Sequence, residues 1–443
     1  MVRPLKSLMI LLTLWSVSAA LVPGSTISYA PERTSTILKW KSGSIKIAIS
    51  GSLLKPGANM KADSDAAGAI NRSLATWAKA AGIVFQESVT EKQNVSPSGN
   101  MGDGVSLITI AQTPENLLLF SKNPQEAAAT TRVFFDRKGF ISEADIVLNP
   151  YQQFSTDGTF GTFDLESTLT HEIGHLLGLD HSPVLSATMH DNYGKNGVFG
   201  LQNFGSRTLA EIDISAIRAK YGSDSGDATE CCGAISGKAL VSKGIGAKGV
   251  QVWAEDSDSG KLFGEGSTRA DGSFRFDGLP AGDYTVYAQQ VGKLKSAFSA
   301  QEIGNVEVES GDASPLIKRL VANVSDVELQ YLGFNGQLSE LAVPLNAGRS
   351  YTLYLGGKNI DKDQISIRFS SPFLTHSKKT ISNVNFGDDI TVVSFEVRVD
   401  PLTPIGEYSL FAESKDGRRS VIVGGIAVRS FSNPFSIFTL SDN

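Results

Sequence analysis

The sequence predicts a multidomain protein in which an α/β (α+β) unit is followed by two all-β sandwich domains. With 443 residues, the chain has room for about three domains of roughly 150 residues each. Helical and strand-like patterns alternate up to residue 222, whereas apolar residues recur with a period of two beyond residue 233. The expected segments are an N-terminal signal segment at 1–30, the α/β unit at 31–222, a linker at 223–232, the first β domain at 233–320, and the second β domain with a tail at 321–443.

The α/β unit is expected to contain four strands and three helices. Apolar side chains at helical spacing from Ala67 to Ala81 predict the first helix, with Trp77 in the core. The second helix is expected to start near Asp164 as its N-cap and to turn Leu169, Ile173, Leu176 and Leu177 toward the core, and the last helix opens with a capping box at 208–211. The expected strands are 45–49, 105–110, 131–135 and 144–148.

Three of the chain's five histidines fall within residues 171–181, which read H-E-I-G-H-L-L-G-L-D-H. On a helix, His171 and His175 stand one turn apart on the same face. Gly178 can adopt the left-handed conformation that ends a helix, so that His181 can return to the same point. Histidine is the commonest protein ligand of zinc, and three histidines with a fourth position left open suit a catalytic zinc site.

Glu172 carries the second half of the expected chemistry. It leaves the helix about 100° round from His171, near the metal but not bound to it. Zinc lowers the pKa of its water from 15.7 to about 7, and a carboxylate at this position can take the proton. A single histidine on a helix more often packs without a metal, and H-E-x-x-H alone arises by chance in long chains. The glycine and third histidine at fixed offsets favour the zinc interpretation.

The full pattern H-E-x-x-H-x-x-G-x-x-H resembles the metzincin signature. With Ser182 added, the stretch H-E-I-G-H-L-L-G-L-D-H-S resembles the matrixin branch of that family. Residues 186–190, S-A-T-M-H, are similar to the family's Met-turn, in which Met189 would underlie the zinc; a lone methionine after a helix would otherwise be a core residue. The resemblance implies a zinc metalloendopeptidase with metzincin topology, with Glu172 as general base and protein or peptide substrates. By position, strand 129–135 is expected to hold an extended substrate, and segment 184–200 to shape the adjoining pocket.

Three departures from the family limit what the resemblance implies. The stretch before the α/β unit has no cysteine that could cap the zinc, and no histidine precedes His171, so we expect one zinc ion and no cysteine-based latency. Asp191 stands where a related branch has a metal-binding tyrosine, and Tyr193 lies two residues further on. Calcium is a weaker expectation near Asp157 and Gly158, where a plain turn is the alternative.

The two β domains carry no catalytic pattern. Residues 272–284 read G-S-F-R-F-D-G-L-P-A-G-D-Y and resemble the carboxypeptidase regulatory-like, transthyretin-like sandwich. Beyond 321, alternating runs separated by turn residues favour an immunoglobulin-like sandwich. Trp253, Tyr331 and Phe334 are expected in the core, with an aromatic binding face as the alternative. Cys231 and Cys232 are adjacent and are expected to be a linker feature, with a redox or intermolecular role as the alternative.

The N-terminus resembles an export signal, with Arg3 and Lys6 before an apolar run at 8–20 and small residues at the candidate cleavage sites. An uncleaved anchor is the alternative; no later stretch is long and apolar enough to span a membrane. The net charge of −6 gives no basis for nucleic-acid binding. We therefore expect a secreted, extracellular peptidase, with the periplasm or cell surface as other locations. The alternative function is surface adhesion, with β domains that bind glycan, cell-wall or matrix ligands and an auxiliary or inactive first unit.

Overall fold

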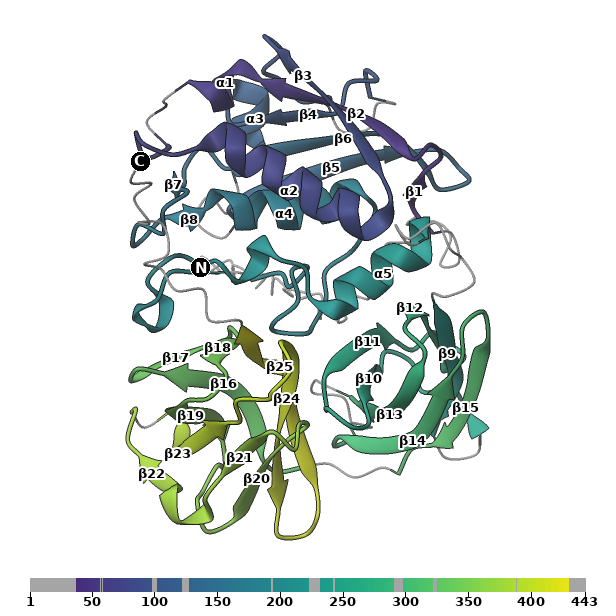
Figure 1. Cartoon of the computed structure of the whole chain (residues 1–443), viewed down its shortest axis with the longest axis vertical. Helices are drawn as coiled ribbons and strands as arrows, with labels where there is room; N and C mark the ends of the chain where they lie inside the picture. The colour runs from purple at the N-terminus through teal and green to yellow at the C-terminus, as the bar shows by residue number, and fades with distance from the viewer. Residues whose placement is uncertain are drawn as a thin grey trace, which may run out of the picture.

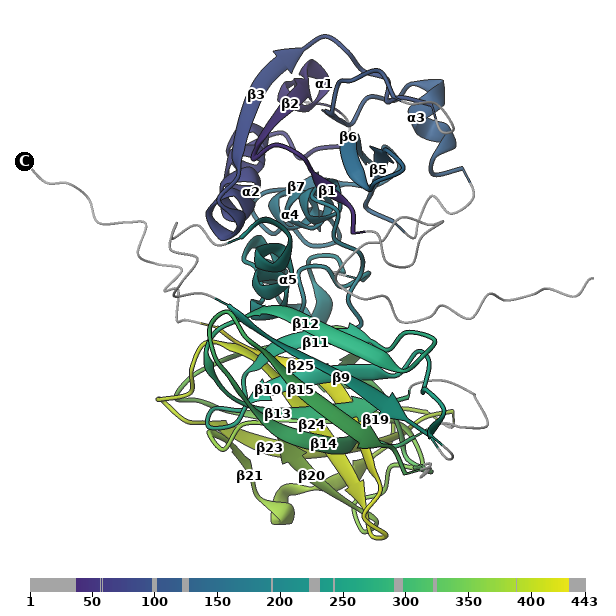
Figure 2. The ribbon, with the colours of Figure 1, turned by 90° about the vertical axis from the view of Figure 1, so that its right-hand side faces the viewer.

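The computed structural model describes residues 37–429 except 56, 58, 98–101, 122–126, 193, 223–231, 242–243, 291–297, 322–324 and 388. The described chain forms an α/β unit and two all-β units that lie beside each other against it (Figures 1 and 2). The expected signal segment, most of the linker with Cys231, the tail and Tyr193 lie outside the described residues. Cys232 is disulfide-bonded. None of the described helices has the length and apolar character needed to cross a membrane.

The sheet of the first unit has the order β1-β6-β4-β2-β3, and β5 pairs with β6. Every pairing is parallel except that of β5, which runs antiparallel to β6 and forms the edge of the sheet. The strand expected at 105–110 is shorter than predicted, because only Leu107–Thr109 pair with neighbouring strands. The strands are β1 (Lys39–Trp40), β2 (Ser44–Ser50), β3 (Val84–Thr90), β4 (Leu107–Thr109), β5 (Ala129–Phe135) and β6 (Phe140–Leu148).

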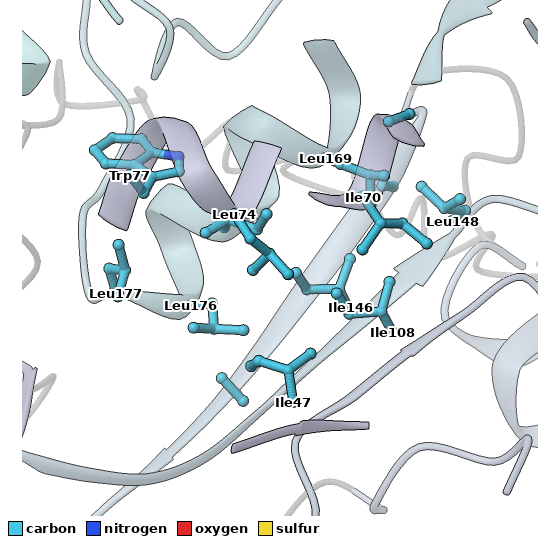
Figure 3. Close-up of a cluster of buried hydrophobic side chains, with 14 of the residues drawn as sticks. Ile47, Ile70, Leu74, Trp77, Ile108, Ile146, Leu148, Leu169, Leu176 and Leu177 are labelled. Atoms are coloured by element: carbon cyan, nitrogen blue, oxygen red, sulfur yellow. The ribbon is translucent and has the colours of Figure 1, made fainter. Parts of the chain in front are cut away.

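Two long helices, α2 (Ala66–Ala81) and α4 (Leu165–Leu176), pack side by side on one face of this sheet. Asp65 and Asp164 cap them by accepting backbone N–H bonds, so the predicted N-cap of the second helix is confirmed. Trp77 is fully buried between them and donates its indole N–H to the Thr170 carbonyl at 2.6 Å. Figure 3 shows the apolar side chains that join these helices to the sheet, among them Leu169, Leu176 and Leu177 of the predicted core face.

The remaining elements of this unit are short, apart from the last helix, α5. It begins at Glu211, later than the predicted capping box. The N-cap residue is Ala210 rather than Thr208, and Asp213 accepts the Ala210 N–H at 3.3 Å. These elements are α1 (Gly51–Leu54), α3 (Pro114–Leu118), β7 (Phe154–Ser155), β8 (Phe163–Asp164), η1 (Val198–Gly200), η2 (Gly205–Arg207) and α5 (Glu211–Tyr221).

The second unit is a sandwich of two sheets with the orders β11-β10-β13-β14 and β12-β9-β15. The predicted turn at Asp271 is present, and Gly272 has a φ of 77°, in the left-handed region that glycine adopts without strain. Trp253 is fully buried, so the core interpretation of this residue is confirmed. The strands are β9 (Gly233–Leu240), β10 (Gln251–Asp256), β11 (Leu262–Ser267), β12 (Ser273–Leu279), β13 (Gly282–Gln289), β14 (Gln301–Val308) and β15 (Ala313–Arg319).

The third unit is also a sandwich, with the orders β17-β16-β19-β23-β21 and β18-β25-β24-β20, and β22 pairs with β23. Alternate residues of β19 and β23, such as Leu353 and Phe395, are fully buried between the sheets, as the period of two predicts. The strands are β16 (Glu328–Phe334), β17 (Gln337–Ser339), β18 (Val343–Asn346), β19 (Ser350–Lys358), β20 (Ile365–Phe369), β21 (Leu374–His376), β22 (Ser382–Val384), β23 (Thr391–Val399), β24 (Gly406–Ser414) and β25 (Arg419–Arg429).

Candidate metal centre

Helix α4 is held firmly at both ends, and this fixes the histidines that it carries. At its start, the Asp164 carboxylate accepts the Ser167 N–H at 2.8 Å and also binds the Arg207 guanidinium. At its end, Gly178 has a φ of 89° and lies so close to the Leu38 carbonyl that a Cβ would overlap it. The chain therefore turns sharply after the helix and brings His181 back beside it.

The structure brings the three predicted ligands together. The Nε2 atoms of His171 and His175 lie 3.1 Å apart, those of His175 and His181 3.1 Å, and those of His171 and His181 3.3 Å. Histidine, cysteine and acidic side chains are the usual candidates for metal ligands. Among the described residues, only these three histidines form a group of at least three such side chains with ligand atoms close enough to bind one ion. The site is thus formed by one helix and the turn that follows it.

The hydrogen bonds of the rings determine which nitrogens are available to a metal. The Nδ1 atom of His171 lies 2.8 Å from the Thr188 carbonyl, and that of His175 lies 2.9 Å from the Leu179 carbonyl. Because a carbonyl oxygen only accepts, each Nδ1 donates its proton and leaves a lone pair on Nε2. Burial and the neighbouring His181 ring lower the pKa of His175 to about 4, which favours the neutral imidazole. The Nε2 atoms of the three rings converge on one point, and those of His171 and His175 are left with lone pairs, which fits a zinc ion.

Glu172 is nearly fully buried and lies beside the same cavity as His175 and His181. Its Oε2 accepts the Thr131 hydroxyl at 2.6 Å, and burial raises the pKa of its carboxyl to about 7. The cavity has a volume of about 300 Å³, and β5 forms its other wall through residues that include Ala129 and Thr131. Glu172 therefore faces the space between the histidines and the edge strand.

Met189 lies under the helix that carries the ligands. It is fully buried, and its Sδ fits against Gly174, between the two helical histidines. The Asp213 carboxylate of α5 accepts the Thr188 N–H at 2.8 Å, and the Thr188 carbonyl in turn accepts the hydrogen bond from His171 Nδ1. The motif predicts Met189. It does not predict Asp213 or Thr131, because Asp213 bonds Thr188 and Thr131 bonds Glu172 across long stretches of the chain. An acidic residue in the first turn of α5 is the one sequence feature that could have indicated Asp213.

We expect Gly174→Ala to loosen α4, although alanine is the better helix former by about 1 kcal/mol. The added Cβ would overlap Met189 Sδ and stand 2.9 Å from the Trp77 ring, and such overpacking costs about 1–3 kcal/mol. Hydrogen exchange of the α4 amides, followed by mass spectrometry, should accelerate. Gly205→Ala is the control, because nothing lies within 4 Å of its Cβ position. Equal protection of α4 in both variants would show that this packing is unimportant.

Two further positions named from the sequence are Asp157, for calcium, and Asp191, where a related branch has a metal-binding tyrosine. Asp157, the centre of the calcium expectation, forms an ion pair with Lys61 and accepts hydrogen bonds from Thr159, so its carboxylate is already occupied. The calcium expectation near Asp157 stays a prediction. The Asp191 side chain is 60% exposed and lies 3.6 Å from His190 rather than joining the three ligands.

Comparison with known proteins agrees with the domain order. Residues 39–222 match the family described as Matrixin, and residues 234–321 match the carboxypeptidase regulatory-like domain. The chain thus carries a matrixin domain, the domain of a zinc-dependent metallopeptidase family, followed by a carboxypeptidase regulatory-like domain.

Individual relatives match only parts of this chain. Metalloendoproteinase 1 of Glycine max is 31% identical over 159 residues, which are 35% of this chain and 45% of that protein. The hatching enzyme of Paracentrotus lividus is 37% identical over 102 residues, which are 22% of this chain and 16% of that enzyme. The chain therefore covers less than half of either relative. Among solved structures, the major pilin subunit of Bacillus cereus is 14% identical, covers 43% of this chain and 66% of its own, and has a TM-score of 0.18, too low to support an argument.

Proposed function

We propose that the protein is a secreted zinc-dependent endopeptidase that hydrolyses peptide bonds of extracellular proteins. The observation that carries the proposal is the convergence of three histidine Nε2 atoms beside a buried glutamate, in a cavity bordered by the edge strand of the sheet. His171, His175 and His181 would hold the zinc. When bound, zinc would polarise the scissile carbonyl and make the attacking water more acidic. The export pattern at the N-terminus supports secretion.

Strand β5 is placed to bind the substrate. It pairs with β6 along one edge and has no strand partner among the described residues on the other. An extended peptide can pair with such an edge through its backbone, which gives affinity without a strict sequence requirement. Since Ala129, Thr130 and Thr131 also border the cavity of the histidines, a peptide on β5 would lie across the proposed zinc position.

Glu172 would perform the proton transfers. Its carboxylate would accept a proton from the attacking water and return it to the leaving amine. Burial suits this work, because the raised pKa of a buried carboxyl brings it near the pH at which it must both accept and release a proton. The Thr131 hydroxyl fixes one of the two carboxylate oxygens from the substrate strand.

We expect Thr131→Val to lower kcat about 10- to 150-fold and to leave KM nearly unchanged. The change removes one hydrogen bond to a charged group, which contributes about 1.5–3 kcal/mol, but keeps the side-chain shape and the backbone of β5. Thr131→Ser keeps the hydroxyl and should restore most of the rate. Steady-state kinetics on one peptide tests this. A Thr131→Val enzyme with normal kcat, or with a change in KM alone, would show that the bond does not position Glu172.

The proposed function itself is tested with a library of end-blocked peptides and the purified full chain. We expect cleavage at internal bonds, identified by mass spectrometry, because β5 is open along its length and an endopeptidase needs no free terminus. Removal of terminal residues from unblocked peptides only, or no cleavage by zinc-loaded protein, would count against an endopeptidase. Sequencing the N-terminus of protein from the culture medium tests secretion, with a start after Ala20 or Ala30 expected.

A further inference from the structure

The segment between the third histidine and the methionine lies between the metal centre and the β units. This segment contacts the metal centre directly, because the Thr188 carbonyl accepts a hydrogen bond from His171 Nδ1. Its two ends are joined by the Ser182 N–H, which donates to the Met189 carbonyl at 2.8 Å. Its outer side contacts the second unit at Glu265 and the third unit at Val423. Residues 182–190, which we call the ligand segment, therefore connect the proposed zinc ligands to both sandwiches.

The third unit contacts the ligand segment through β25. The Leu185 N–H donates to the Val423 carbonyl at 3.2 Å, so the backbones of the two units are hydrogen-bonded. Gly424 has a φ of 64°, and a Cβ there would overlap Val184 and stand 2.6 Å from Ser186 Oγ. The close approach thus requires glycine, and the contact is specific rather than a loose touching of surfaces.

An apolar cluster shared by all three units anchors this contact. Each unit contributes fully buried side chains, among them Val184 from the ligand segment, Leu262 from β11 and Phe411 from β24. The rings of Trp253 and Tyr287 stack at 5.4 Å, and Tyr287 contacts Phe411. Because all these side chains would be exposed if the units separated, the cluster holds the units together.

The second unit adds a separate connection through α5, which lies between the α/β unit and the sandwiches in both views (Figures 1 and 2). Lys261 forms an ion pair with Glu211 at 2.8 Å, and a Cβ on Gly278 of β12 would overlap the Ser215 carbonyl. Helix α5 carries Asp213, which accepts the Thr188 N–H. The carboxylate of buried Glu265 in β11 also lies 3.5 Å from the hydroxyl of Ser182, the residue that follows His181.

We propose that the two β units are positioning elements of the metal centre: they hold the ligand segment and α5 so that His171, His181 and Met189 keep their places. The consequence for catalysis rests on the proposed function, whereas the consequence for metal retention does not. Phe411 and Leu262 are the positioning residues that test it, because each belongs to the shared cluster that also contains Val184 and Ala187 of the ligand segment.

The test compares two matched pairs of variants in the full chain. Phe411→Leu removes part of a ring from the shared cluster, and Phe395→Leu makes the same change inside the third unit's own core. Leu262→Ala and Leu279→Ala form the corresponding pair in the second unit. All four residues are fully buried, so that the members of each pair lose similar packing.

The readouts are the rate of zinc transfer to a coloured chelator and, separately, kcat and KM. We expect Phe411→Leu and Leu262→Ala to release zinc about 3- to 30-fold faster than their partners and to lower kcat more than they change KM. Equal zinc release within each pair would overturn the inference, as would a wild-type chain that takes up no zinc. Faster release by the cluster variants without any peptide cleavage would leave the inference standing and refute the proposed function.

Discussion

Glu172→Gln will lower kcat by about 10²- to 10⁴-fold, the range for loss of a general acid–base group, while zinc stays bound. Glutamine has the same shape, and its amide oxygen can still accept the Thr131 hydroxyl. It cannot take a proton from the attacking water, so the loss should fall on kcat. Steady-state kinetics together with the zinc content of the same sample measure both parts of the prediction.

Glu166→Gln is the control for this change, because Glu166 lies on the same helix and is similarly buried. Its carboxylate pairs with Arg72 of α2 at 2.7 Å rather than with any of the three ligands. We expect the control to keep a kcat near that of the wild type. A Glu172→Gln enzyme that kept more than about a tenth of the wild-type kcat would contradict the assignment of this residue as the base.

His181→Ala will weaken zinc binding more than about 100-fold, the upper range for losing a group that merely supports a ligand. The change leaves two converging Nε2 atoms and opens the site to water. Because His181 lies after α4 and only its side chain is removed, α4 should keep its caps and its core contacts. Elemental analysis after gel filtration in a chelator-buffered solution gives zinc per chain, and circular dichroism checks the fold.

His376→Ala serves as the matched histidine variant. His376 lies in the third unit, where its ring contacts Phe369 and Phe395 and its Nε2 lies 2.6 Å from the Ile367 carbonyl. We expect this variant to retain one zinc per chain. If His181→Ala also kept one zinc at the wild-type affinity, the third ligand would be wrong.

Local sequence predicts the ligands well because their geometry is local. His171 and His175 need only a helix, and Gly178 supplies the turn that returns His181, so spacing alone specifies the cluster. The N-cap at Asp164 is equally local. The capping interaction predicted at 208–211 is displaced to Ala210 and Asp213. Asp213 also accepts the Thr188 N–H, a contact with a distant segment that local spacing does not predict.

Contacts between distant segments could not be predicted from spacing. Thr131 was expected in the edge strand, but nothing in a strand pattern says that its hydroxyl meets Glu172, 41 residues further along the chain. Trp253 was likewise expected to be buried, yet apolar periodicity is the same for a side chain that faces its own sandwich and one that faces a neighbouring unit. The shared cluster therefore emerges only from the three-dimensional arrangement.

Cleavage of casein by the purified full chain, before and after metal removal, tests the central claim most directly. We predict that the chain cleaves casein with one zinc bound, loses this activity when a chelator removes the zinc, and regains it when zinc is restored. Activity that persists after complete zinc removal would contradict the account, as would intact casein in the presence of fully zinc-loaded protein.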